Sequence, residues 1–359
     1  MIKYLSRLKI VEEAYTAKVF PGLNAVKGIL IMLVIYTHSL PNGMLLYFNY
    51  FFHMPVFLAV SGYLLKRSAF KFGIFHYLQR LFHRLIIPWL IATVCYFPFS
   101  FRLRHLADFT LTDIIYPFYH LWYVPAYVIG VLICFTVIKL RIPAIIILIL
   151  TGAFTIVWYD IYRSTYLAVE QQPLYILGEK RFYSYQVFFF LGFALRNGLI
   201  QIKLPALLLV IVATVAFVAS VILVYSNASD YTISVPYMFF NLSLVLFLLL
   251  YFAPLALFQH PLILLINKQS LGIYLYHPMI IFSIYHWLGD PHKLRSNNFE
   301  GFGVGTATLV IVLSGIWMIQ QWDLANRLLL GIVEKAETVK NTVVKATTIE
   351  KGTTKNKKK

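Results

Sequence analysis

The chain has 359 residues, of which 60% are hydrophobic and only 13% are charged. A soluble domain carries roughly 45–50% apolar residues, so this composition excludes a water-soluble globular protein. The net charge of +17 would suit a nucleic-acid partner, but the basic residues fall between apolar segments and in a lysine-rich C-terminal stretch. Membrane topology accounts for them better, and no nucleic-acid partner is expected.

Ten apolar segments, separated by Pro, Gly and charge clusters, follow one another along the chain. Most approach the length of ~20 residues with which a helix crosses the hydrocarbon core. They predict an all-α integral membrane protein with about ten transmembrane helices, at 22–40, 47–65, 85–101, 118–138, 143–159, 183–197, 203–225, 234–257, 270–288 and 303–325. The first twenty residues contain no apolar region that ends in small residues, so the N-terminus is expected to remain in the mature protein.

Lys and Arg are distributed unevenly between the two sides of these predicted spans. Of the 31, 23 fall in segments on the side of the N-terminus and 7 on the opposite side. Because basic loops stay in the cytoplasm, both termini are predicted to be cytoplasmic. The predicted organisation is a cytoplasmic N-terminal segment (1–21), a transmembrane domain (22–325) and a basic, disordered tail (326–359). The tail is expected to be solvated or to bind lipid headgroups, and a charge run without a specific role stays open as the alternative.

Ionisable side chains inside a membrane are costly, so those within the predicted spans are the first candidates for function. Hardly any carboxylate is among them, and they comprise Lys27, His38, His53, His120, His277 and His286. The two cysteines, Cys95 and Cys134, lie in predicted spans, where a thiol behaves as a small apolar side chain. The sequence therefore predicts no disulfide, no metal and no bound cofactor.

Lys27 and His38 lie eleven residues apart in the first predicted span. Eleven residues are about three helical turns, so the two side chains share one face and lie about 16 Å apart along the axis. A cation near the cytoplasmic end suits a phosphate-bearing ligand, and a histidine suits a general base at neutral pH. A snorkelling lysine and a histidine with ordinary helix-end hydrogen bonds fit the spacing equally well.

The second span and the connection after it add three further candidates. Pro55 and Gly62 predict a bent, closely packed helix beside a cavity that His53 could line, although an interfacial histidine in an aromatic belt fits as well. Arg80 and Arg84 lie one helical turn apart on one face, an arrangement that suits the binding of phosphate at the cytoplasmic surface. Ordinary positive-inside charge is the alternative for the two arginines.

Taken in order, these motifs resemble the acyltransferase family 3 membrane proteins. The resemblance covers about residues 20–325 and rests on Lys27 with His38, His53–Pro55 with Ser61–Tyr63, Arg80 with Arg84 and Pro88, His120–Tyr123, and Tyr274–Pro278. Such proteins O-acetylate or O-succinylate surface polysaccharides and lipid-linked sugars in the bacterial inner membrane, typically with acyl-CoA from the cytoplasm. The resemblance implies an enzyme, an acyltransferase for groups other than aminoacyl groups, in most cases an O-acetyltransferase.

The resemblance also implies site residues and partners. Catalytic roles fall on His38 and His53, and acyl-CoA binding falls on Lys27, Arg80 and Arg84. Acceptor binding is implied for His120, Trp122, Tyr276 and His277. The donor is acetyl-CoA or another acyl-CoA, and the partners are membrane lipid, a carbohydrate or lipid-linked glycan acceptor, and polysaccharide synthesis proteins. The family usually has Arg where this chain has Lys27. Lysine keeps the positive charge but lacks the planar guanidinium that forms paired hydrogen bonds.

Two other classes of protein compete with the enzyme. A polysaccharide exporter or flippase is the first, although the scarcity of carboxylates in the predicted spans argues against a proton-driven carrier, and the histidines leave it open. A scaffold within a polysaccharide synthesis complex is the second. The absence of a Gly-rich phosphate loop, an HExxH helix and a GxSxG elbow argues against ATPase and hydrolase functions.

Overall fold

The computed structural model describes residues 20–97, 111–118, 120–163, 178–226, 228–289 and 297–332. Every regular element in these ranges is a helix, as the composition predicts, and they contain no strand. The helices around the site described below are α2 (Pro21–Ser39), α3 (Met44–Leu64), α7 (Tyr123–Leu140), α9 (Arg181–Ser184), α10 (Gln186–Arg196) and α14 (Ser270–Trp287). The others are α4 (Ile74–Leu81), α5 (Ile87–Cys95), α6 (Leu111–Ile115), α8 (Ala144–Arg163), α11 (Ala206–Tyr225), α12 (Asp230–Phe247), α13 (Pro261–Lys268), α15 (Asn298–Ile319) and α16 (Asp323–Leu330).

Six helices of the described chain are long and apolar enough to cross a membrane. They are α2, α3, α7, α11, α15 and a continuous segment, Thr232–Phe252, that joins α12 to the π-helical turn Leu248–Phe252. The other four predicted spans coincide in position with α5, α8, α10 and α14. Over their described residues, these four helices are not both long enough and apolar enough to count as membrane-spanning. The chain is thus a multi-pass helical membrane protein.

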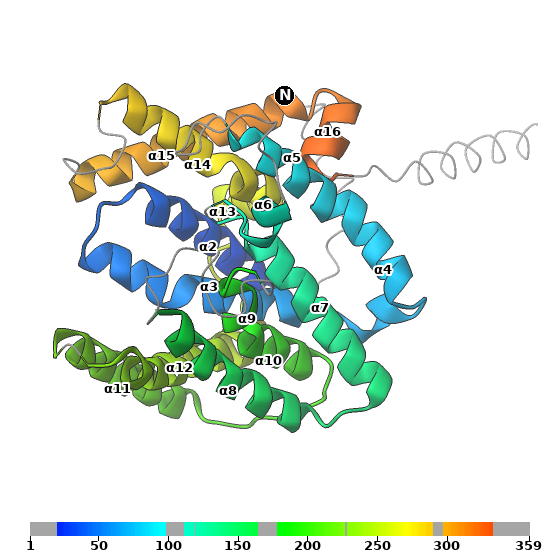
Figure 1. Cartoon of the computed structure of the whole chain (residues 1–359), viewed down its shortest axis with the longest axis vertical. Helices are drawn as coiled ribbons and strands as arrows, with labels where there is room; N and C mark the ends of the chain where they lie inside the picture. The colour runs from blue at the N-terminus through cyan, green and yellow to red at the C-terminus, as the bar shows by residue number, and fades with distance from the viewer. Residues whose placement is uncertain are drawn as a thin grey trace, which may run out of the picture.

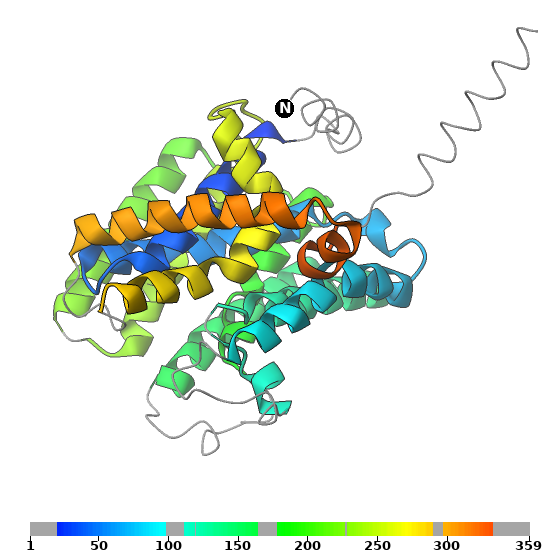
Figure 2. The same ribbon diagram turned by 90° about the horizontal axis from the view of Figure 1, so that it is seen from above.

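Helices α2 and α3 run side by side through the middle of the molecule (Figure 1). On one side, α2 packs against α13, α14 and α15, and on the other, α3 packs against α10 and α12. The same arrangement is seen from above in Figure 2, where α14 and α15 lie across α2. Most of the largest buried side chains of these two helices therefore face other helices, and this region forms the centre of the core.

Glycines allow α3 and α10 to approach closely. A side chain at Gly62 would collide with the backbone of Phe189, and a side chain at Gly192 would collide with the backbone of Ala59. Small residues at such crossings let helix backbones touch inside a membrane, where packing replaces the hydrophobic effect between helices. The prediction of close packing at Gly62 is confirmed.

Prolines in these helices leave backbone carbonyls without their usual partners, because proline has no N–H to donate to the carbonyl four residues earlier. One such carbonyl is bonded by a side chain from another helix: the Phe51 carbonyl, four residues before Pro55, accepts from Asn241 Nδ2 at 3.0 Å. The Leu121 carbonyl, just before α7, accepts from Trp89 Nε1 at 2.9 Å. Both bonds attach one helix to another.

The C-terminal boundary differs from the prediction. The last long helix, α15, ends at Ile319, and the tail predicted from residue 326 is helical as far as Leu330, which is buried. Helix α16 ends at Gly331 (φ 64°), where any side chain would collide with the backbone of Arg84. The packing of α16 against α5 explains the difference. The rest of the predicted tail (333–359) and most of the predicted N-terminal segment (1–19) lie outside the described residues.

Candidate functional site

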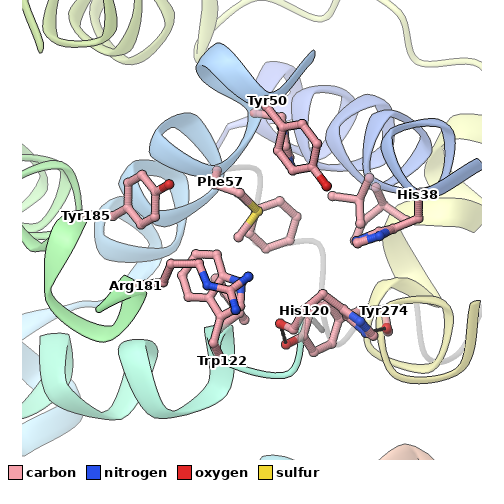
Figure 3. Close-up of a pocket in the computed structure, with 13 residues that line it drawn as sticks. His38, Tyr50, Phe57, His120, Trp122, Arg181, Tyr185 and Tyr274 are labelled. Atoms are coloured by element: carbon pink, nitrogen blue, oxygen red, sulfur yellow. Dashed lines mark hydrogen bonds between the residues drawn. The ribbon is translucent and has the colours of Figure 1, made fainter. Parts of the chain in front are cut away.

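A pocket opens between α2, α3, the turn before α7, the start of α10 and α14 (Figure 3). Its lining is aromatic and basic, and among the described residues it contains no carboxylate. The lining consists of Ile31, Val34, His38, Tyr50, His53, Met54, Phe57, His120, Trp122, Tyr123, Arg181, Tyr185 and Tyr274. Three of the predicted histidines, His38, His53 and His120, are therefore brought together around one cavity.

Helix α2 presents one continuous face to this pocket. Ile31, Val34 and His38 follow each other at helical spacing and line it, and Lys27 lies one turn earlier on the same face. Lys27 itself is half-buried and does not line the pocket. The predicted shared face is therefore present, with the histidine at the pocket and the lysine nearer the start of the helix.

Three histidines from different parts of the chain form a cluster at one end of the pocket. The ring centroids of His38 and His120 are 5.6 Å apart, those of His38 and His277 are 5.2 Å apart, and those of His120 and His277 are 4.7 Å apart. His120 and His277 are buried, whereas His38 is partly exposed and faces the pocket. We call these three residues the histidine cluster.

Pro278 sets the hydrogen bonds of the histidine cluster. It lies four residues after Tyr274 and cannot donate to the Tyr274 carbonyl, which instead accepts hydrogen bonds from His120 Nε2 and, at 3.0 Å, from His277 Nδ1. His277 Nδ1 also lies 2.9 Å from the Ile273 carbonyl. The carbonyl freed by one proline therefore orients two imidazole rings.

These hydrogen bonds assign the tautomers of His120 and His277. A carbonyl can only accept, so His120 Nε2 and His277 Nδ1 carry the protons. The opposite nitrogens, His120 Nδ1 and His277 Nε2, are buried and have no hydrogen-bond partner. A proton there would bury an unpaired charge, which is costly, so both rings are neutral and each offers a lone pair inside the cluster.

The histidine cluster is also the place where a metal could bind. One nitrogen from each ring lies within 4.8 Å of the others, and histidines that bind metals typically donate their second nitrogen to a carbonyl or carboxylate, as two of these do. At the upper limit of that spacing, a point equidistant from the three nitrogens lies about 2.8 Å from each, which is the length of a hydrogen bond to oxygen. A zinc ion would need the nitrogens at about 2.0–2.1 Å.

Arg181 and its neighbours form the opposite side of the pocket (Figure 3). Its Nε donates to Glu179 Oε1 at 3.0 Å, and its guanidinium lies 5.3 Å from the centre of the Trp122 ring. Trp122 in turn stacks on Tyr185, with ring centroids 5.4 Å apart. The guanidinium is thus held on two sides, by a carboxylate and by an aromatic face.

His53 lines the pocket from α3 without joining the histidine cluster. Its Nδ1 is hydrogen-bonded to the Asn49 carbonyl, and the ring of Tyr50 lies 5.6 Å away. Because the Asn49 carbonyl fixes the proton on Nδ1, Nε2 is the nitrogen that could accept a proton. The predicted cavity beside this helix is present, and His53 is buried in its wall.

The predicted basic residues Arg80 and Arg84 are exposed and lie near Tyr77, a half-buried tyrosine of α4. The Arg80 guanidinium is 5.9 Å from the centre of the Tyr77 ring. Burial raises the pKa of Tyr77, and a hydrogen bond from Tyr127 and the charges of Arg80 and Arg84 partly offset this rise. Both arginines therefore lie close enough to act on the same phenol.

A column of tyrosines leads from this basic segment toward the pocket. The Tyr77 hydroxyl lies 3.0 Å from the Tyr127 hydroxyl, and the rings of Tyr127 and Tyr123 are 6.4 Å apart. Tyr123 lines the pocket, and its hydroxyl lies 2.7 Å from Ser61 Oγ. We call Tyr77, Tyr127 and Tyr123 the tyrosine column.

Not every predicted site residue faces the pocket, and some residues that do were not predicted. Tyr276 donates to the Leu329 carbonyl at 3.1 Å, at the end of α16, and His277 lies behind the pocket in the histidine cluster. Sequence reasoning missed Tyr50, Arg181 and Tyr185. Tyr50 and Tyr185 carry no motif, and Arg181 falls at the edge of a predicted loop, where positive charge has ordinary explanations.

Apolar helices that enclose a histidine-lined pocket define the chain as a multi-pass membrane protein with a candidate site inside the helix bundle. The chain belongs to the Acyl_transf_3 family, described as "Acyltransferase domain", whose model matches residues 20–320. This match confirms the resemblance drawn from the motifs and makes the protein an acyltransferase of the membrane type. No curated protein and no solved structure matches the chain.

Proposed function

We propose that the protein is an O-acyltransferase of the bacterial inner membrane. It transfers an acyl group, most simply acetyl, from cytoplasmic acyl-CoA to a hydroxyl of a surface polysaccharide or lipid-linked sugar. The observation that carries this proposal is the histidine cluster at the end of the pocket, in a chain of an acyltransferase family. No bound cofactor takes part, and acyl-CoA is a substrate.

His38 is the general base of the proposed reaction, because it is the one member of the histidine cluster that is partly exposed to the pocket. Its imidazole takes the proton of the acceptor hydroxyl while the hydroxyl oxygen attacks the thioester carbonyl. The carbon–sulfur bond then breaks, and the proton passes from the imidazolium to the departing thiolate, which leaves as CoA-SH. The products are the ester and free coenzyme A, with no net release of protons.

The two neutral rings behind His38 stabilise it in its charged form. Triad-like sites usually use a carboxylate to orient the base, but the pocket lining of the described chain has none. The lone pairs of His120 Nδ1 and His277 Nε2 can accept an N–H from a His38 imidazolium after a small movement, since one nitrogen of each ring lies within 4.8 Å of the others. Hydrogen bonds of this kind often shorten only in the reacting complex.

The donor binds from the cytoplasmic side in this proposal. Arg80 and Arg84 are exposed and adjacent, which suits the phosphates of coenzyme A, and Lys27 adds a charge on the α2 face that leads to His38. The tyrosine column occupies the space between the basic segment and the pocket. The hydroxyl groups of these tyrosines suit the amide groups of the pantetheine arm of coenzyme A. The tyrosine rings move aside as the acyl group reaches His38.

The acceptor enters from the opposite side, in line with a topology of ten crossings and cytoplasmic termini. In that topology the end of α2, the start of α3 and Arg181 all lie toward the outer surface. The acceptor is then bound by His120 and Trp122, while His53 is the alternative base should His38 prove dispensable. Proteins of polysaccharide synthesis are the expected partners in the membrane.

Mass spectrometry of surface glycans tests the proposal directly. A strain that lacks this chain should lose ester groups that the complemented strain retains, and membranes with the wild-type chain should incorporate label from acyl-labelled acetyl-CoA. A complement carrying His38→Ala should fail, whereas His286→Ala, an exposed histidine of α14 that does not line the pocket, should succeed. Glycan that reaches the surface only with the chain, yet never carries ester, would favour the exporter.

A further inference from the structure

Arg181 is a charged residue of the pocket that the acyl-transfer chemistry above does not use. Its side chain is 34% exposed, so a ligand in the pocket can reach it. The hydrogen bonds that it makes to described residues involve its backbone nitrogen and its Nε, both directed to Glu179. No described residue accepts a hydrogen bond from its two terminal nitrogens, Nη1 and Nη2, so a ligand in the pocket can do so.

Glu179 and Trp122 hold the guanidinium in place. Burial raises the pKa of Glu179, but the charge and hydrogen bonds of Arg181 lower it more, so that the pKa ends below its ordinary value and the carboxyl stays ionised. Glu179 bonds only the Nε edge, and the Trp122 ring covers one face of the guanidinium. A guanidinium that is already oriented loses little entropy when it binds a ligand.

The position of Arg181 suggests which part of a ligand it contacts. Figure 3 shows Arg181 across the pocket from His38, with Tyr50 on a third side. Tyr50 is 49% exposed, and the face of an exposed phenol ring suits a sugar ring. A sugar whose reacting hydroxyl lies at His38 would therefore present another substituent to Arg181.

We propose that Arg181 is an anion-binding residue of the acceptor site and that the acceptor is an acidic sugar unit, bearing a carboxylate or a phosphate. The Nη edge of a guanidinium forms paired hydrogen bonds with two oxygens of such a group, a geometry that ammonium cannot reproduce. The described lining contains no carboxylate that would repel the ligand from within the pocket, and Glu179 lies behind the guanidinium. Glu179 is a positioning residue in this arrangement.

This inference rests on the proposed function, and its test separates the two. The full-length protein, purified in detergent, is assayed with acetyl-CoA and three acceptors: an alkyl glucoside, the matching glucuronide and the matching 6-phosphate. Variants are Arg181→Gln, Arg181→Lys and, as a matched control, Arg141→Gln, which removes an exposed arginine at the end of α7, outside the pocket. Thermal stabilisation by each glycoside, measured without acetyl-CoA, gives a readout that needs no turnover.

The wild type should show a KM about tenfold or more lower for one of the acidic acceptors than for the neutral one, and the better of the two identifies carboxylate or phosphate. Arg181→Gln should abolish this preference with kcat nearly unchanged, Arg181→Lys should keep a part of it, and Arg141→Gln should keep all of it. Equal KM values for neutral and acidic acceptors would overturn the inference. A fall in kcat with every acceptor would also overturn it, because Arg181 would then stabilise the oxyanion.

Failure of the proposed function gives a different pattern. If the wild type transfers no acyl group to any acceptor, but an acidic glycoside alone raises its melting temperature and Arg181→Gln removes that effect, the anion site stands and the enzyme assignment falls. If no glycoside changes the melting temperature and none is acylated, Arg181 has no role in acceptor binding and the inference is wrong.

Discussion

The histidine cluster and the basic segment that contains Arg80 and Arg84 differ in how far their side chains are exposed to solvent. His120 and His277 are buried and fixed by backbone carbonyls, whereas Arg80 and Arg84 are exposed. Buried and oriented groups suit chemistry, because their geometry does not have to reorganise during the reaction. Exposed cations suit the capture of a charged ligand from solution. Substitutions in the histidine cluster should therefore lower the turnover rate, whereas substitutions of Arg80 or Arg84 should weaken the affinity for the acyl donor.

The largest effect is expected from His38→Ala, which removes the proposed base from the pocket. General-base catalysis contributes typically 10²–10⁴-fold, so kcat should fall by about that factor while expression and insertion stay normal. Acyl transfer in membranes with matched protein levels measures it, and His286→Ala serves as the control. Full activity in His38→Ala would transfer the role of base to His53 or favour the exporter.

The second largest effect is expected from Pro278→Ala, which tests how the histidine cluster is held. Alanine restores the N–H that bonds the Tyr274 carbonyl within the helix, so His120 Nε2 and His277 Nδ1 must compete for it. Loss of a hydrogen bond that orients a charged site costs about 1.5–3 kcal/mol, so kcat should fall roughly 10- to 100-fold.

Pro236→Ala is the matched control for Pro278→Ala, since Pro236 lies inside α12 and outside the pocket. Both variants favour helix formation and should be expressed at least as well as the wild type. Equal kcat in Pro278→Ala and wild type would show that the freed carbonyl does not orient the rings.

A smaller effect, confined to the donor, is expected for Arg80→Ala and Arg84→Ala. Each should weaken acyl-CoA affinity by about 1–3 kcal/mol, as for charge-assisted hydrogen bonds, and raise the donor KM with little change in kcat. Arg67→Ala, in the same connection, is the control. An unchanged donor KM in both variants would remove the two arginines from the donor site.

Lys27→Arg should have a smaller effect still and in the opposite direction. The arginine supplies the planar guanidinium that the resemblance implies for this position, so activity should be kept or modestly raised. Steady-state kinetics with varied acetyl-CoA measure it. A strong loss of activity would mean that the half-buried site is shaped for lysine and that the charge alone is not what matters.

The smallest effect is expected from chelation. No step of the proposed reaction needs a metal in the histidine cluster, so EDTA or phenanthroline should leave acyl transfer unchanged. Elemental analysis of the purified protein provides the independent measurement. About one zinc per chain, lost in His277→Ala, would turn the cluster into a metal site with His38 as a ligand.

The sequence by itself determined the membrane class, the helical fold and the family. Apolar length dictates helices in a bilayer, because each helix satisfies its own backbone hydrogen bonds. The spacing of Lys27 and His38 also placed them on one helical face, since helix geometry is local. The ten crossings and the cytoplasmic termini stay predictions.

Only the tertiary structure decided which groups meet. His38, His120 and His277 are far apart along the chain, and nothing local reveals that their rings converge or that the Tyr274 carbonyl binds two of them. The same holds for Arg181, which sequence reasoning left among ordinary loop charges and which packing places over Trp122 in the pocket. Contacts between helices depend on how glycines, prolines and side-chain volumes fit together, and that fit is a property of the whole core.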